Sequence, residues 1–183
     1  MSEAGALQAL PSPWAQFLDK VDELLPRPVE LHCLGGFVLT VLYGLPRPTG
    51  DIDYISVIPS NEVGTIEAIA GANSELAKKY KIHVQFVTIA EVPDNYETRL
   101  IEIPQRYSKL RLFALDPHDI VLSKLTRNTA RDDGDVAFLA SKGVLKPAVL
   151  KERYEKELRP RLGNVERHDL TLQLWVESYL AKC

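Results

Sequence analysis

The chain has 183 residues with a formal net charge of −3, and 45% of the residues are apolar while 26% are charged. This length suits one domain, or one domain with a small helical addition, and the apolar content is enough for a folded core. The composition excludes a strongly basic protein that binds nucleic acid over its whole surface, although Arg and Lys gather between residues 99 and 131.

The cysteines and the apolar stretches of the sequence indicate the cellular compartment in which we expect the protein. Cys33 and Cys183 are the two cysteines of the sequence, and their positions suggest neither a disulfide framework nor a zinc site. No apolar stretch reaches the length of a membrane span, and the N-terminus lacks the pattern of a secretory signal. We therefore expect a cytoplasmic protein that makes no membrane contact.

The first half of the chain alternates helical and strand patterns. Apolar residues at helical spacing predict a helix over about residues 13–25, which ends at Pro26 and Pro28. The pattern then predicts in turn a strand at 29–34, a helix at 37–43, a strand at 51–58, a helix at 62–80 and a strand at 81–89.

The second half is mostly helical. Residues 99–103 and 110–115 are predicted to be paired strands, and four helices follow, at about 116–127, 132–142, 147–158 and 165–181. We therefore expect an α/β (α+β) fold with a mixed-sheet core over residues 1–115. Residues 116–183 are expected to form a C-terminal helical region packed on that core.

The first motif with chemical meaning joins the strand at 29–34 to the strand at 51–58. Gly35 and Gly36 follow an apolar strand, and without a Cβ they let backbone N–H groups approach a phosphate closely. Asp51 and Asp53 open the next strand, and residues two apart in a strand point to the same side. Two convergent carboxylates suit Mg²⁺ (or Mn²⁺), which prefers carboxylates together with phosphate oxygens and water.

Three competing assignments fit this motif less well. Two solvated acids on a surface strand are the usual meaning of an isolated Asp-x-Asp, but the combination with Gly35-Gly36 favours nucleotidyl transfer. A phosphatase of the haloacid-dehalogenase type places its Asp-x-Asp after an apolar strand, whereas here the apolar residues follow the pair. A P-loop is excluded because the sequence has no Gly-Lys-Ser or Gly-Lys-Thr.

A second group of charged residues lies between residues 124 and 135. Lys124 stands among apolar neighbours in a predicted helix, and Arg127 and Arg131 follow it, with Asp132 and Asp135 at the start of the next helix. Acids at a helix start, with Asp132 as the cap, are the ordinary use of such residues. The alternative is that Lys124 or Arg127 meets triphosphate charge, while Asp132 or Asp135 orients that cation or helps to activate a hydroxyl.

Taken together, these motifs resemble a known superfamily. The motifs are Gly35-Gly36, Arg47-x-Thr49-x-Asp51-Ile52-Asp53, Lys124-Leu125 and Arg131-Asp132-x-x-Asp135. They resemble the polymerase-β-type nucleotidyltransferases, and in particular the abortive-infection branch whose members act as toxins in toxin–antitoxin pairs. The resemblance covers about residues 29–140, and it implies an enzyme that moves an NMP from an NTP to an acceptor such as a tRNA or a protein. It also implies a cognate antitoxin.

The resemblance assigns a role to each matching residue. Gly35 and Gly36 would hold the nucleotide phosphates, and Asp51 and Asp53 would bind magnesium. The remaining assignments are Arg47 and Thr49 at the mouth of the pocket, Lys124 toward the triphosphate, and Asp132 or Asp135 completing the catalytic site. In the mechanism that we expect, Arg127 or Arg131 joins Lys124 in offsetting the developing charge on the triphosphate.

The sequence departs from the superfamily pattern at one place. Many members carry a third carboxylate on the next core strand, where this chain has His83 and Gln85 and neither Asp nor Glu. A neutral amide at Gln85 cannot act as a general base. The departure keeps a second hypothesis open, a catalytically degenerate module that binds nucleotide without transferring it.

Overall fold

The computed structural model describes residues 10–181, so Cys183 lies outside the described residues. The chain divides into two compact units. The first, here called the sheet unit, contains the described residues up to Thr88 together with Ile101–Ala114. The second, the helical unit, contains Ile89–Leu100 and the described residues from Leu115 onward.

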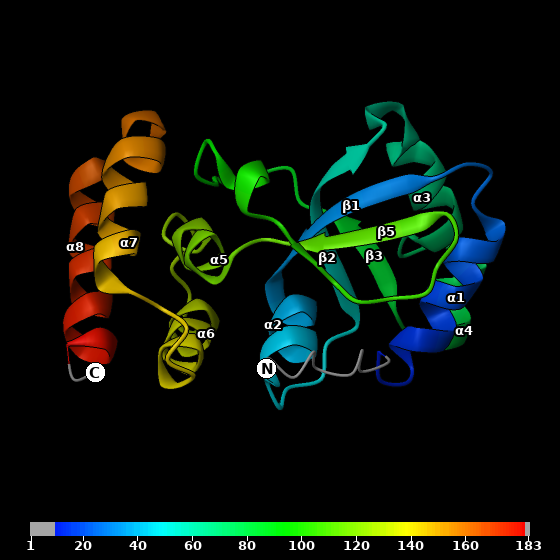
Figure 1. Ribbon diagram of the computed structural model, residues 1–183, viewed down its shortest axis with the longest axis horizontal. Coiled ribbons are helices and arrows are strands. Elements are labelled where there is room, and N and C mark those ends of the chain that lie inside the picture. The colour runs from blue at the N-terminus through cyan, green and yellow to red at the C-terminus, as the bar shows by residue number, and fades with distance from the viewer. Residues whose placement is uncertain (1–9, 182–183) are drawn as a thin grey trace, which may run out of the picture. The chain divides into compact units, whose positions relative to one another are not determined.

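The sheet unit is built on a mixed sheet, as predicted. Over residues 10–181 this sheet has five strands in the order β3-β2-β1-β5-β4 (Figure 1). Strand β1 pairs antiparallel with β2 and parallel with β5, β2 pairs parallel with β3, and β4 pairs antiparallel with β5. The bounds are Val29–Leu34 for β1, Asp51–Ile58 for β2, His83–Phe86 for β3, Ile101–Glu102 for β4 and Leu110–Ala114 for β5.

The helices of the sheet unit bury their apolar residues. Helix α1 buries Trp14, Phe17, Leu18 and Val21, which recur at helical spacing and so form one apolar stripe. The bounds are Trp14–Leu24 for α1, Gly35–Tyr43 for α2, Val63–Ala70 for α3 and Glu75–Tyr80 for α4.

The single helix predicted over 62–80 is wrong, because the structure has two helices there. Helix α3 ends before Gly71, whose backbone is extended and lies so close to the Glu67 carbonyl that a Cβ would meet that oxygen at 2.5 Å. Ser74 then begins α4 as its N-cap and accepts a hydrogen bond from the Ala77 N–H at 3.1 Å. The strand predicted over 81–89 is also shorter in the structure, where β3 ends at Phe86.

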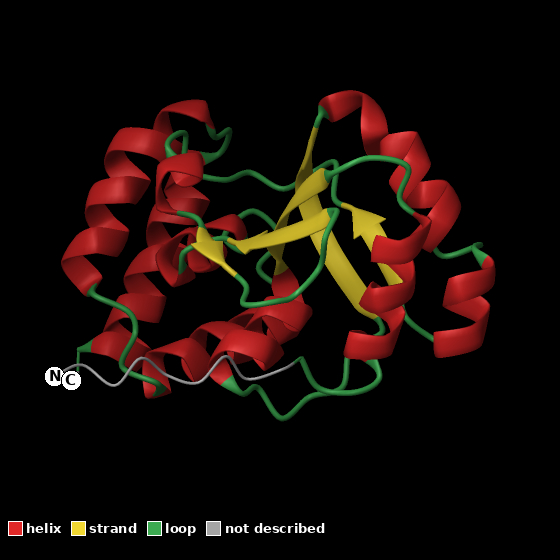
Figure 2. Cartoon of the chain, turned by 45° about the vertical axis from the view of Figure 1, so that its right-hand side comes forward, coloured by secondary structure: helices red, strands yellow, loops and turns green. Residues whose placement is uncertain are grey.

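The helical unit follows the predicted succession of helices, and the strands of residues 10–181 all belong to the sheet unit (Figure 2). Helices α7 and α8 lie side by side, and each continues into a π-helical turn (Figure 1). Among the described residues, no helix has the length and apolar character needed to cross a membrane. The bounds are Pro117–Ser123 for α5, Ala130–Ser141 for α6, Pro147–Arg153 for α7 and Val165–Trp175 for α8.

A buried ion-pair network joins residues 89–100 to these helices. The Arg99 guanidinium donates two hydrogen bonds of 3.0 Å to the Asp119 carboxylate, which is fully buried in α5. It also donates to both oxygens of Glu157, at 3.2 and 2.9 Å, in the π-helical turn after α7. One guanidinium therefore connects three segments, and this explains why a stretch that precedes β4 belongs to the helical unit.

Asp116 extends the same network at the start of α5. Its carboxylate caps the helix by accepting the His118 N–H at 2.9 Å, and it also accepts from the Arg153 guanidinium at 2.7 Å. Burial alone would raise the pKa of Asp116, but the hydrogen bonds from His118 and Arg153 outweigh it and lower that pKa to about 2. Arg153 also reaches Asp119, at 3.0 Å.

Replacing Arg99 by Leu should destabilise the helical unit by about 3–5 kcal/mol, because the substitution leaves the buried Asp119 carboxylate without its bidentate partner. Urea unfolding followed by circular dichroism measures the loss. The matched control is Lys156→Leu, which removes an exposed ion pair of 2.8 Å with Glu152 and should cost less than about 1 kcal/mol. Equal losses in the two variants would contradict the structural role of Arg99.

The network also predicts acid sensitivity. Because the pKa of Asp116 is lower in the folded protein than its ordinary value of 3.8, its contribution is complete above about pH 4 and is lost as the pH falls toward 2. The contribution is roughly 2 kcal/mol. Urea titrations at several pH values between about 2 and 6 measure it, and the Asp116→Asn variant should show a smaller fall than the wild type. An identical fall in both proteins would rule out Asp116 as its source.

Candidate functional site

The predicted glycine and aspartate motifs meet at one edge of the sheet unit. In the antiparallel pairing of β1 with β2, Leu34 lies opposite Asp53, so Gly35 follows directly at the end of β1. Gly35 has a φ of +77°, and a Cβ there would collide with Oδ2 of Asp53 and lie 3.3 Å from its Cγ. The Asp53 carboxylate therefore lies against the backbone of Gly35, in space that only a glycine leaves open.

This contact lies at the N-terminus of a helix. Helix α2 begins at Gly35 and includes Gly36 as its second residue, and the N-terminus of a helix favours negative charge. Thr40 of the same helix donates its hydroxyl to the Gly36 carbonyl at 2.9 Å. The two predicted glycines are thus placed where anionic groups are stabilised, next to one of the two predicted carboxylates.

The residues before β2 fix the position of Asp51. The Asp51 N–H donates to the Thr49 hydroxyl at 3.3 Å, which orders the turn that leads into the strand. The carbonyl of Arg47 lies 3.4 Å from the Thr40 hydroxyl, so this part of the loop lies close to α2. Arg47 itself is half-buried. The structure therefore places the Arg47 backbone close to α2 and Thr49 next to Asp51, while their roles at the mouth of a nucleotide pocket stay predictions.

Strand β3 places His83 and Gln85 beside the carboxylates. In the parallel pairing of β2 with β3, Asp51 is opposite His83 and Asp53 is opposite Gln85. Nε2 of His83 lies 3.8 Å from Oδ1 of Asp51, and the Asp51 side chain is 45% exposed. Gln85 therefore lies directly opposite Asp53 on the neighbouring strand.

The second predicted group forms a buried cluster in the helical unit. Nζ of Lys124 donates to Asp132 at 3.2 Å and to Asp135 at 2.9 Å, and the three side chains are 5% exposed or less. Arg127 is mostly exposed, yet its Nε donates to Asp132 at 2.8 Å. Two cations and two carboxylates thus balance in charge within the cluster.

The helix start near Asp132 differs from the prediction. The N-cap of α6 is Thr129, whose hydroxyl accepts the Asp132 N–H at 3.2 Å, while the Asp132 carboxylate accepts the Thr129 N–H at 3.0 Å. Asp132 is therefore the third helical residue of a capping box, and its prediction as the N-cap is wrong. Burial would raise its pKa, but hydrogen bonds from Arg127 and Thr129 lower that pKa well below its usual range.

Arg131 and Asp133 flank Asp132 in the sequence, and the structure places each of them differently from Asp132. Arg131 is exposed. Asp133, which the sequence analysis did not single out, accepts from Nε1 of Trp175 at 3.1 Å and from the Tyr179 hydroxyl at 2.7 Å. It therefore joins α6 to the C-terminal helix, and its position among the acids of the first turn of α6 gave no signal of this role.

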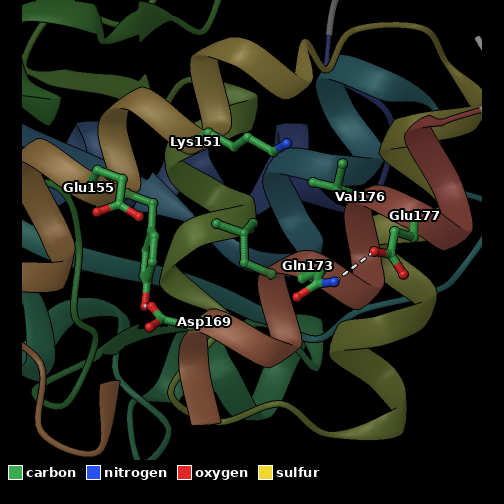
Figure 3. Close-up of a pocket in the computed structure, with 8 residues that line it drawn as sticks. Lys151, Glu155, Asp169, Gln173, Val176 and Glu177 are labelled. Atoms are coloured by element: carbon green, nitrogen blue, oxygen red, sulfur yellow. Dashed lines mark hydrogen bonds between the residues drawn. The ribbon is translucent and has the colours of Figure 1, made fainter. Parts of the chain in front are cut away.

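A pocket of about 480 Å³ in the helical unit contains none of the predicted site residues (Figure 3). Leu172 and Val176 of the C-terminal helix contribute apolar surface to it, and Asp169 accepts the Tyr154 hydroxyl at 2.6 Å. Arg159 also donates to Asp169, at 2.9 Å, so this carboxylate is engaged in structural hydrogen bonds.

The fit of a metal ion rests on Asp51 and Asp53. Among the described residues, no group of three or more His, Cys, Asp or Glu side chains converges on one point. A pair of carboxylates is nevertheless what Mg²⁺ takes from a protein when phosphate oxygens and water supply its other ligands. The Asp53 carboxylate fills the space that the missing Cβ of Gly35 leaves, which sets one of these two carboxylates beside the N-terminus of α2.

Comparison with known protein families gives a match over most of the chain. The model of a family described as a nucleotidyltransferase of unknown function (DUF6036) matches residues 16–178. No curated protein and no solved structure matches the chain. The matched range includes every residue of the two predicted groups.

The Gly35–Asp53 contact predicts a stability difference between two glycines. Gly35→Ala and Gly44→Ala both place a side chain at a φ near +75°, which costs about 1–2 kcal/mol, but a Cβ at Gly44 meets nothing within 4 Å. Gly35→Ala should therefore destabilise the protein more than Gly44→Ala in urea unfolding. When Asp53 is also replaced by Ala, the excess cost at Gly35 should disappear. An excess that persists in the double variant would show that the Asp53 carboxylate is not its cause.

Proposed function

The chain belongs to the nucleotidyltransferases of unknown function (DUF6036), and from this premise we propose that it transfers an NMP from an NTP to an acceptor at Asp51 and Asp53, with Mg²⁺ or Mn²⁺. The observation that carries the proposal is the contact of Asp53 with Gly35 at the N-terminus of α2. Through this contact, carboxylates that can bind a cation lie beside a helix N-terminus whose backbone N–H groups can bind a phosphate.

In this proposal Asp51 and Asp53 hold the metal ion. When bound, Mg²⁺ supplies charge neutralisation for the triphosphate and for the transition state. Gly35 and Gly36 hold the phosphates at the helix N-terminus, while Thr49 fixes the start of β2 and thereby the direction of Asp51. The protein positions the reactants and stabilises charge, as enzymes of phosphoryl transfer generally do.

The transfer makes one bond and breaks one. The acceptor oxygen bonds to the α-phosphorus, the bond from that phosphorus to the oxygen bridging to the β-phosphate breaks, and pyrophosphate leaves with the electron pair. The acceptor proton passes to water. Gly35 and Gly36 would keep the phosphates in place while the charge moves from the acceptor to the leaving group, and Asp51 and Asp53 would hold the cation that neutralises that charge.

We assign Lys124, Asp132 and Asp135 a structural role. They are buried and hydrogen-bonded to one another, and they join the end of α5 to the start of α6. The catalytic roles that the resemblance implies for these three residues stay predictions. So do the contacts of the exposed Arg127 and Arg131 with the triphosphate.

One observation favours a second function, a module that binds nucleotide without transferring it. Gln85 lies opposite Asp53, where many members of the resembled superfamily have a carboxylate, and an amide cannot accept the acceptor proton. The same Asp51 and Asp53 would then hold a metal–nucleotide complex that is not consumed. Binding and turnover, measured separately, distinguish the two functions.

The acceptor and the partner follow from the resemblance alone. It implies a tRNA or a protein as the acceptor, and a toxin–antitoxin pair with a cognate antitoxin. Both stay predictions, to be tested once the nucleotide is known.

Isothermal titration calorimetry with ATP, CTP, GTP and UTP, each with and without Mg²⁺, tests the proposed site. We expect Mg²⁺-dependent binding of at least one NTP, and the Asp51→Asn/Asp53→Asn variant should weaken it by about a hundredfold, because both metal ligands lose their charge. The control is Asp19→Asn, an exposed carboxylate of α1, which should bind as the wild type does.

Pyrophosphate release under the same conditions separates the two functions. Release that depends on Asp53 supports the transferase, and Mg²⁺-dependent binding without release supports the module. Failure of every NTP to bind would overturn both.

A further inference from the structure

Strand β3 lies at one end of the sheet and leaves half of its backbone groups directed outward. In the parallel pairing with β2, the His83 N–H donates to the Gly50 carbonyl at 2.9 Å and the Val87 N–H donates to the Tyr54 carbonyl at 2.8 Å. Backbone groups alternate in direction along a strand, so those of Val84 and Phe86 point away from β2. An edge of this kind can pair with another extended chain.

A pocket runs along this edge. It has a volume of about 620 Å³ and is lined by all four residues of β3 and by α3 and the turn that follows it. The opposite wall carries small residues, Gly64, Ala68, Gly71 and Ala72. Small side chains let a main chain approach closely, so the pocket suits an extended segment that lies between α3 and β3.

The chemistry of the lining favours a peptide over a nucleic acid. Among the described residues that line the pocket there is neither Lys nor Arg, whereas Glu67 contributes a carboxylate. Affinity for nucleic acid comes mainly from cations that contact phosphates, and a carboxylate repels them. The amides of Asn73 and Gln85 offer neutral hydrogen-bonding groups, which suit a polypeptide.

We propose that this pocket, here called the β3 groove, docks an extended peptide that adds a strand to β3 and presents a Ser, Thr or Tyr hydroxyl as the acceptor. The proposal rests on the proposed nucleotidyl transfer. Asp53 and Gln85 are paired across β2 and β3, so their side chains lie on the same face of the sheet. In a strand added to β3, the residue opposite Gln85 would also have its side chain on that face. Its side chain there stands about two strand spacings, roughly 10 Å, from Asp53 on the same face.

The transfer to such a peptide balances. The hydroxyl oxygen bonds to the α-phosphorus of the NTP, pyrophosphate leaves with the electron pair of the broken phosphorus–oxygen bond, and the hydroxyl proton passes to water. The product is a peptide with a phosphodiester-linked nucleoside. Main-chain pairing with β3 supplies affinity without sequence preference, and the groove selects among side chains.

Labelling from α-³²P-NTPs tests the proposal with the full chain. The probes are a peptide library with a fixed central Ser, Thr or Tyr among mixed residues, and bulk tRNA. We expect label in the peptides. Ala68→Trp, which fills the β3 groove from an exposed position of α3, should raise the KM for peptide by about tenfold. It should leave the NTP Kd unchanged, which also shows that the variant is folded.

The matched control is Lys78→Trp, at an exposed position of α4 that does not line the pocket, and it should label peptides as the wild type does. Label in tRNA alone, or no label from an NTP that binds, overturns the docking proposal and leaves the nucleotide site intact. Equal KM values in Ala68→Trp and the wild type overturn the role of the β3 groove. If no NTP binds in calorimetry, the proposed function itself fails and the docking proposal with it.

Discussion

The antiparallel register of β1 with β2 is the constraint on which the candidate site depends. It sets Leu34 opposite Asp53, and the next residue, Gly35, then has no room for a side chain. A shift of one residue would turn Asp51 and Asp53 to the other face of the sheet, where Ile52 is buried. The same shift in register would expose buried apolar residues to solvent. The apolar pattern of both strands therefore favours the register that positions the carboxylates.

The helical unit depends on charges inside it rather than on apolar packing alone. Asp119, Asp132 and Asp135 are buried, and each contacts a cation from another segment of the unit. Buried carboxylates are costly unless they are paired and hydrogen-bonded, so these contacts specify which segments must meet. Arg99 shows the consequence, because its ion pairs draw a segment that precedes β4 into the helical unit.

The local features of the site could be predicted from the sequence. The Gly-Gly pair, the strand with two aspartates and the neighbouring strand with Gln85 follow from apolar periodicity and turn residues, and the strand pairing of the structure sets them side by side. The roles of the acids after Lys124 could not be predicted, because a capping box, an ion pair and a catalytic acid use the same residue types. Asp133 illustrates this, since its partners Trp175 and Tyr179 lie more than 40 residues away.

The sequence by itself determined the mixed class of the fold and most of the succession of strands and helices along the chain, because these depend on periodicity within short windows; the break between α3 and α4 was the exception. Tertiary structure alone decided three features: the contact of Asp53 with Gly35, the open edge of β3 and the assignment of residues 89–100 to the helical unit. Each depends on which distant segments pair, and the free energy of that pairing comes from packing and buried charge that no single window of sequence contains.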